Sequence, residues 1–144
     1  MQLESERSHN NRLSVDLPCT KKSLVRVREK IRKFAGEHGF EPLVEDIQLA
    51  TQEAIKNVIQ HACPADNNVH VDFTALGDRM VVEVSDIGQG FDPEAVQNEA
   101  LSPMALHGRG LRLMEGLMDD VRIMSDQEGT FVRMEKMRAS PDGS

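Results

Sequence analysis

Apolar residues recur with two different periods along this chain, and the change of period separates expected helices from expected strands. Apolar positions three or four residues apart predict an amphipathic helix, whereas strict alternation predicts a strand with one buried face. Thr20 is the expected N-cap of the first helix, Gly39 is its expected stop, and Pro42 opens the second helix. The sequence predicts a strand at 12–17, helices at 20–38 and 42–62, strands at 68–75 and 79–84, a helix at 109–120 and strands at 120–125 and 130–137, with room for a short helix near 94–100.

This order of elements predicts a two-layer α/β sandwich of the α+β type, with helices on one face of a mixed, mostly antiparallel sheet. A length of 144 residues fits one domain with a sizeable buried core. We expect the domain to span residues 13–137. Residues 1–12 are expected to form a flexible N-terminal arm, and residues 138–144 a flexible tail.

Composition narrows the classes of function. The net charge is −7, from 17 basic and 24 acidic residues, which argues against a nucleic-acid binder that depends on phosphate attraction. No apolar run approaches the roughly 18 residues of a membrane span, and the polar first residues lack the apolar core of a signal peptide. We therefore expect a cytoplasmic protein that does not bind membranes. The two cysteines are too few for a disulfide framework and are expected to be reduced.

The second predicted helix carries a polar stripe. Glu53, Asn57 and His61 are spaced four residues apart, so they share one side of the helix. A solvated helix face would also show such a stripe, but Lys and Arg usually populate those faces. A glutamate and an asparagine in register suit a carboxylate base and a neutral oxygen ligand for Mg²⁺. We interpret His61 as a helix-end histidine with local hydrogen bonds.

Three further motifs contain glycine. In "SDIGQGFD", Asp86 ends a strand as an acceptor-only side chain, and Gly88 and Gly90 remove Cβ atoms where a flat ring or a phosphate chain would collide. In "HGRGLRLM", Gly108 and Gly110 precede a helix whose first amides would form an anion site. In "EGT", Thr130 begins a strand. Each motif alone is also explained by a turn or a helix entry.

Together the motifs "EAIKN", "DIGQG", "GRGL" and "GT" resemble the asparagine box and the three glycine boxes of the ATPase superfamily that contains gyrase, histidine kinases and heat-shock chaperones, the Bergerat fold. Within it, the compact length and "GRGLRLMEGLMDDV" are most similar to the anti-sigma factor serine/threonine kinases of bacterial partner switching. The similarity covers about residues 13–137. Arg112 stands where histidine kinases commonly have a third glycine, which argues against a sensor kinase fragment.

The resemblance implies a role for each matching residue. Glu53 would be the general base on a protein hydroxyl, and Asn57 would coordinate the Mg²⁺ that bridges the phosphates of ATP. Asp86 would read adenine, with Gly88 and Gly90 at the pocket wall and Thr130 below it. Residues 91–107 would form a lid. The second glycine box, which would wrap the phosphates, is Gly108, Arg109, Gly110 and Leu111, with Arg112 and His107 behind Arg109 as further cations.

Several functions stay open at this point. The first is an ATP-dependent serine/threonine kinase that phosphorylates a STAS-type anti-anti-sigma protein and binds a sigma factor. The second is a nucleotide-gated binding module with negligible turnover. The third is a partner-switching kinase whose target is not a sigma factor. The resemblance also implies a homodimer. The exposed face of "RLSVDL", or of a strand in the hairpin expected from the strands at 68–75 and 79–84, would serve as its interface.

Overall fold

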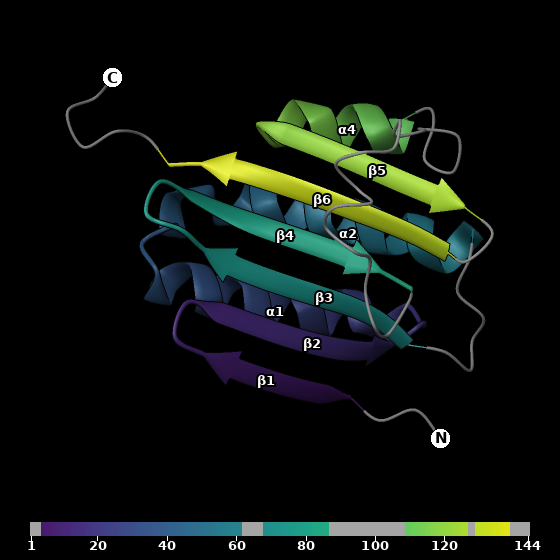
Figure 1. The fold of residues 1–144 in the computed structure, drawn as a ribbon, viewed down its shortest axis with the longest axis horizontal. Helices are drawn as coiled ribbons and strands as arrows, with labels where there is room; N and C mark the ends of the chain where they lie inside the picture. Colours follow the sequence, from purple (N-terminus) through teal and green to yellow (C-terminus); the bar gives the residue numbers. More distant parts are fainter. Residues whose placement is uncertain (1–3, 62–67, 87–108, 127–128, 139–144) are drawn as a thin grey trace.

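A computed structural model describes residues 4–61, 68–86, 109–126 and 129–138. Within them lie three α-helices, one 3-10 turn and six strands (Figure 1). The helices are α1 (Lys22–Glu37), α2 (Val44–His61) and α4 (Arg109–Leu117), and the 3-10 turn η1 is Glu41–Leu43. The strands are β1 (Ser5–His9), β2 (Arg12–Pro18), β3 (Asn68–Ala75), β4 (Arg79–Ser85), β5 (Asp120–Asp126) and β6 (Gly129–Met137).

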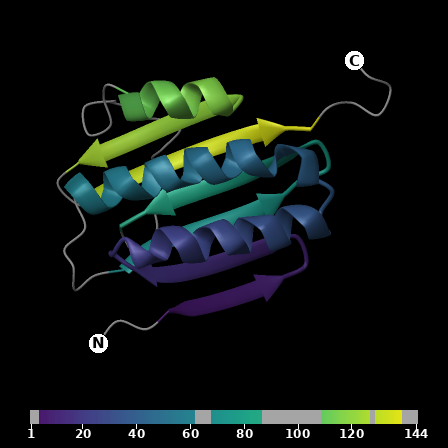
Figure 2. The ribbon, with the colours of Figure 1, turned by 180° about the vertical axis from the view of Figure 1, so that it is seen from behind.

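The six strands form one sheet in the order β1-β2-β3-β4-β6-β5, and every pairing among them is antiparallel. The three helices lie together on one face of this sheet, as Figure 2 shows from the helix side. The predicted two-layer α+β sandwich is therefore confirmed. The one departure from sequence order is β6, the last strand, which lies between β4 and β5.

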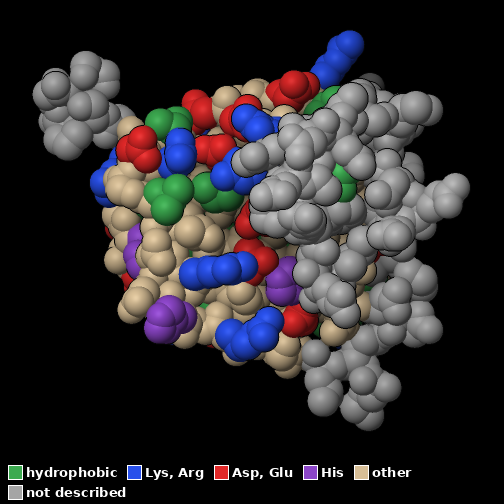
Figure 3. All heavy atoms as spheres, viewed as in Figure 1, with side chains coloured by type: hydrophobic (Ala, Val, Ile, Leu, Met, Phe, Trp, Pro, Cys, Tyr) green, Lys and Arg blue, Asp and Glu red, His purple; other side chains and the backbone are tan. Residues whose placement is uncertain are grey.

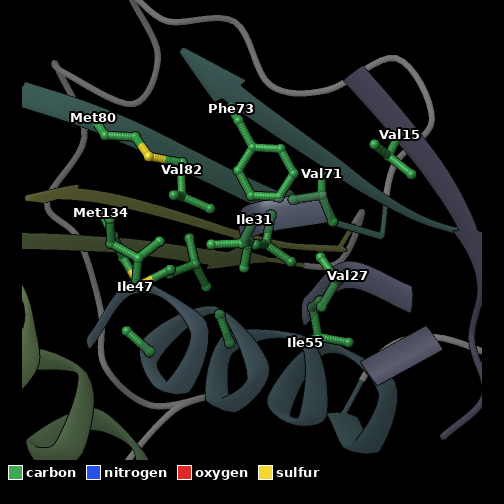
Figure 4. Packing of buried hydrophobic residues seen from close by; sticks show 14 of the residues in the cluster. Val15, Val27, Ile31, Ile47, Ile55, Val71, Phe73, Met80, Val82 and Met134 are labelled. Carbon is green, nitrogen blue, oxygen red and sulfur yellow. The ribbon is translucent and has the colours of Figure 1, made fainter. Parts of the chain in front are cut away.

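The core lies between the sheet and the helices. Alternate residues of the central strands, such as Val71 and Phe73 on β3, point toward Ile31 of α1 and Ile47 and Ile55 of α2 (Figure 4). All five of these side chains are fully buried. Their period of two on the strands and three to four on the helices is the pattern that predicted both element types.

Residues 5–9 differ from the prediction of a flexible arm. They form β1, which pairs with β2 from Ser5 opposite Asp16 to His9 opposite Arg12. A two-residue turn joins the strands, and Asn10 in it has a φ of 52°, a conformation that asparagine tolerates better than most residues. The arm prediction is therefore wrong for β1. The predicted tail from residue 139 onward lies outside the described residues.

The ends of α1 confirm one expectation and correct another. The N-cap is Lys21, with no side-chain cap, and Thr20 contributes only its backbone carbonyl, which accepts from the amide of Ser23 at 3.1 Å. The Thr20 cap is therefore wrong. At the other end Gly39 has a φ of +83°, and the amide of Phe40 donates to the carbonyl of Ala35 at 2.8 Å. This left-handed glycine ends the helix as predicted.

Cys19 follows β2 directly and is buried. It is disulfide-bonded, so the expectation that both thiols are reduced is wrong for this residue. The other cysteine in the sequence, Cys63, lies outside the described residues.

Where Figure 3 shows described residues, the face of the sheet that the helices leave uncovered carries many charged side chains. His70 on β3 lies between two carboxylates, with Nδ1 2.7 Å from Oδ1 of Asp16 and Nε2 2.8 Å from Oδ2 of Asp72. Asp72 also accepts from the hydroxyl of Ser14 and pairs with Arg12 at 3.2 Å. The hydrogen bond to Asp72, assisted by Asp16, raises the pKa of His70 to about 9. These contacts link β2 to β3 on the open face.

Candidate functional site

The polar stripe of α2 contains the two residues expected to perform chemistry. Glu53 and Asn57 are both half-buried on the helix, and the side-chain Nδ2 of Asn57 donates to the backbone carbonyl of Glu53 at 2.9 Å. Lys56 lies beside them, with Nζ 3.2 Å from Oε1 of Glu53. The lysine is more than half exposed while the glutamate is 23% exposed, so the carboxylate is the more sheltered member of the pair.

The first turn of α4 lies against this stripe. A Cβ atom placed on Gly110 would be 2.8 Å from Nδ2 of Asn57 and 3.7 Å from Oε2 of Glu53. Side chains almost never approach at 2.8 Å, so only glycine fits this position without displacing the asparagine. The close approach joins two motifs that are 53 positions apart in the chain. It also places the amino-terminal turn of a helix, with its positive partial charge, next to the predicted base and metal ligand.

Two residues on neighbouring strands form another part of the site. Asp86 follows the end of β4 and is half-buried, and its Oδ1 accepts from the backbone amide of Thr130 at 2.8 Å. The amide of Asp86 donates in turn to the carbonyl of Thr130 at 3.4 Å. Thr130 lies at the start of β6 and is fully buried. The pairing of β4 with β6 therefore places the amide of Thr130 where it orients the carboxylate of Asp86.

A lysine clamps the far end of α4. Nζ of Lys136, on β6, donates to the carbonyl of Leu117 at 2.5 Å and pairs with Oδ2 of Asp46 in the first turn of α2 at 3.1 Å. A cation at a helix carboxyl end satisfies a carbonyl that lacks an intrahelical partner. The clamp ties α4 to α2 at one end, and Gly110 touches α2 at the other. The position of α4 over the polar stripe is therefore fixed at both ends.

Part of the predicted site lies outside the described residues. This applies to Gly88, Gly90 and Gly108, to the lid at 91–107 with the short helix near 94–100, and to His107. Arg109 begins α4 and His61 ends α2, but their side chains also fall outside the description. Leu111 is half-buried and packs against the core. The structure thus brings Glu53, Asn57 and Gly110 together, and separately Asp86 with Thr130.

The donor set suits Mg²⁺ only in combination with a phosphate ligand. Among the described residues there is no group of three or more His, Cys, Asp or Glu side chains that would hold a metal ion by itself. Asn57 uses its amide nitrogen on the helix backbone, which leaves the amide oxygen as the group able to bind a cation. Mg²⁺ commonly binds one or two protein oxygens and completes its shell with phosphates and water. A single asparagine oxygen fits that pattern.

Sequence reasoning passed over Lys56. The spacing would have predicted its ion pair with Glu53, because residues three apart on a helix lie on the same side. The charged network of His70 on the open face was passed over as well, because alternation marks those positions only as facing away from the core.

Comparison with known proteins is consistent with this geometry. Residues 17–136 match the histidine kinase-like ATPase domain. The chain belongs to that family. The matched residues include α2, α4 and the paired strands β4 and β6, which carry the candidate site.

Relatives in the family narrow the class further. A serine-protein kinase RsbW from Listeria monocytogenes is 32% identical over 139 residues, which are 88% of this chain and 87% of that protein. The RsbW of Bacillus licheniformis is 38% identical over 104 residues, and the chain spans only 64% of its length. The RsbW of Bacillus subtilis is 36% identical over 103 residues. The resemblance to the anti-sigma factor serine/threonine kinases is therefore confirmed.

A solved structure shows the same fold. The crystal structure of the RsbU and RsbW domains of Rv1364c from Mycobacterium tuberculosis aligns with a TM-score of 0.63 and 22% identity. The alignment covers 91% of this chain and 33% of that one.

In the described parts of this chain, none of the helices has the length and apolar character needed to cross a membrane.

Proposed function

We propose that this protein is an ATP-dependent serine/threonine kinase of a bacterial partner-switching system, which phosphorylates a STAS-type anti-anti-sigma protein and binds a sigma factor. The observation that carries the proposal is the contact of Gly110 with Asn57 and Glu53. It puts a carboxylate, an amide oxygen and a helix amino terminus in one place, as transfer of a phosphoryl group requires. The names of the RsbW relatives support the same activity.

In this proposal the chain contributes orientation and one proton acceptor. Glu53 accepts the proton of the partner hydroxyl, and Lys56 holds one of its two oxygens. Asp86, fixed by Thr130, accepts from the adenine amino group, with Gly88 and Gly90 at the pocket wall. Gly108, Arg109, Gly110 and Leu111 wrap the phosphates at the start of α4. Mg²⁺, held by Asn57, would neutralise charge on the phosphates when bound.

The test is the replacement Glu53→Ala. Transfer to a STAS-domain protein encoded beside this chain, read by intact mass after incubation with Mg-ATP, should fall by about 10² to 10⁴-fold. Binding of ATP, read by calorimetry, should change little, because the carboxylate touches the acceptor rather than the nucleotide. Glu45→Ala, an exposed glutamate in the first turn of the same helix, is the matched control and should transfer at the wild-type rate.

Two results would contradict the proposal. Loss of ATP binding together with transfer in Glu53→Ala would give the glutamate a structural role. Tight, stoichiometric binding of the STAS protein by the wild type, without any transfer, would favour the nucleotide-gated binding module instead. A partner-switching kinase whose target is not a sigma factor would give the same results in the Glu53→Ala test. Binding assays with a sigma factor distinguish that kinase from the one proposed.

A homodimer belongs to the same proposal. β1 is one of the two outer strands of the described sheet, with β5 at the other edge, and all five residues of β1 are exposed. A groove of about 430 Å³ lies between β1 and α1, and its lining residues include Leu13, Phe34, Lys33 and Glu37. An outer strand next to a partly apolar groove suits a second copy related by a two-fold axis. We propose that the kinase acts in the cytoplasm as this dimer.

A further inference from the structure

Exposed apolar side chains gather near the proposed base. Among the residues that the structure describes, four large hydrophobic side chains are well exposed: Val25 at 62%, Leu49 at 49%, and Leu113 and Met137 at 40% each. Single exposed apolar residues are ordinary on protein surfaces and need no explanation. Here, however, the first three come from three neighbouring helices, α1, α2 and α4, and the contacts described below place them at similar heights along the helix axes, close to that of Glu53.

The hydrogen bonds between α1 and α2 set the level of Val25. Nε2 of Gln52 donates to the carbonyl of Leu24 at 3.2 Å, and Nε2 of Gln48 donates to the carbonyl of Arg28 at 2.9 Å. The two helices are therefore antiparallel, and Val25 lies between the levels of Gln48 and Gln52. That is within about one helical turn, or about 5 Å, of Glu53 along the axis of α2.

The contacts at the two ends of α4 set the level of Leu113. Gly110 touches Asn57, and the carbonyl of Leu117 is linked through Lys136 to Asp46. α4 therefore runs antiparallel to α2, and the two helices lie side by side (Figure 2). Leu113 is three residues, about 4.5 Å, beyond Gly110, which brings it alongside Glu53.

Leu49 completes the group from α2 itself. It precedes Glu53 by four residues, and side chains four apart on a helix are neighbours on one surface. Both residues reach the surface of the helix layer, Leu49 as exposed and Glu53 as half-buried. We call Val25, Leu49 and Leu113 the helix-layer patch.

We propose that the helix-layer patch is the docking surface for the protein whose hydroxyl Glu53 deprotonates. This inference rests on the proposed kinase function, because the acceptor must bring a protein segment to the carboxylate. An apolar rim excludes water around the transferred proton and anchors the partner beside it. The partner would carry apolar side chains within a few residues of its acceptor serine or threonine.

Charge on α1 adds a second feature to the expected partner. The chain as a whole carries −7, yet α1 contains six basic and two acidic residues. Lys21, Lys22 and Arg28 are exposed and lie three or four positions from Val25, as does the exposed Glu29, so the border of the patch on that side is basic in balance but includes one carboxylate. A partner surface that is acidic next to its apolar contact is complementary to this arrangement.

The test compares two sets of glutamine substitutions, because glutamine keeps helix propensity while removing apolar surface. The first is the triple variant Val25→Gln, Leu49→Gln and Leu113→Gln. The second is Met137→Gln, a control with the same exposed fraction as Leu113 but on the last strand. The triple variant should raise the KM for the STAS-domain protein by about tenfold or more while kcat stays within about twofold. Met137→Gln should change neither.

The outcomes separate this inference from the function on which it rests. ATP binding of the triple variant should match the wild type, and its thermal unfolding should stay close to the wild type, since each side chain is at least 40% exposed. If the wild type transfers phosphate and the triple variant has the same KM as Met137→Gln, the docking surface is wrong and the kinase stands. If the wild type binds the STAS protein without transfer and only the triple variant loses that binding, the docking surface stands and the kinase is wrong.

Discussion

Position 110 has no space for a methyl group, which makes Gly110→Ala a sharp test of the nucleotide site. The added Cβ would lie 2.8 Å from Nδ2 of Asn57, so the amide has to leave its place on the helix backbone. We expect the Kd for Mg-ATP to rise by about tenfold, which corresponds to about 1.4 kcal/mol of binding free energy. The measurement is calorimetry, because the chain has no Trp or Tyr to report binding by fluorescence.

Gly116 supplies the control on the same helix. A Cβ there meets nothing within 4 Å. Gly116→Ala should leave the Kd unchanged and stabilise the fold by about 0.5–1 kcal/mol, because alanine loses less conformational entropy in a helix than glycine. Equal affinities for the two variants would show that Asn57 moves aside without cost and does not hold the ligand.

At the residue scale the sequence predicted which residue types belong to the site but not how they touch. Glu53 and Asn57 stand out by their spacing, and Asp86 by its place at a strand end. The contact of Gly110 with Asn57 depends on how α4 is laid across α2, which no local pattern contains. The Lys56–Glu53 pair, in contrast, follows from helix geometry alone.

Among the elements, the link between β2 and β3 has a pH dependence. The pKa of His70 is raised from 6.5 to about 9, so its ion pairs stabilise the fold fully below about pH 6.5 and lose that effect as pH rises through 9. Burial alone would raise the pKa of Asp72, but hydrogen bonds from His70 and Ser14 lower it to about 2. The aspartate therefore contributes stability that is present above about pH 3.8 and disappears as pH falls through 2.

Replacing His70 by Gln should reveal this contribution. At pH 7 the variant should lose about 1–3 kcal/mol of unfolding free energy, because Asp72 and Asp16 lose a charged partner. Urea unfolding followed by circular dichroism at pH 7 and at pH 9.5 gives the measurement. The gap between wild type and variant should shrink at the higher pH. His9→Gln, on the exposed strand β1, is the control; a similar loss there would contradict the role of the network.

Element prediction succeeded wherever one face of an element is buried. β2, β3, β4 and β6 alternate because their alternate residues enter the core, and the three α-helices show the matching helical spacing. β1 was not predicted because all five of its residues are exposed, so its sequence shows no alternation of apolar and polar residues. The signal that remained was the Asn10–Asn11 pair, a two-residue sequence suited to a tight hairpin turn.

For the whole molecule, the outer position of β1 leads to a prediction about mass in solution. At micromolar concentration the protein should sediment at twice its chain mass of 16.1 kDa. Ser8→Pro should shift it to the monomer, because proline disrupts the strand whichever neighbour its amide faces. ATP binding should persist, since the contacts at Asp86 and Gly110 involve no residue of β1. A monomeric wild type would contradict the proposed dimer edge.

The interior position of β6 has a consequence for folding. Thr130, which orients Asp86, belongs to β6, and this strand lies between β4 and β5 although it follows both of them in the chain. Until it arrives, β4 is a bare, valine-rich margin open to strands of other chains. Under the proposed function, a truncation that removes β6 should therefore weaken ATP binding, because Asp86 loses the amide of Thr130, and should promote aggregation at the same time.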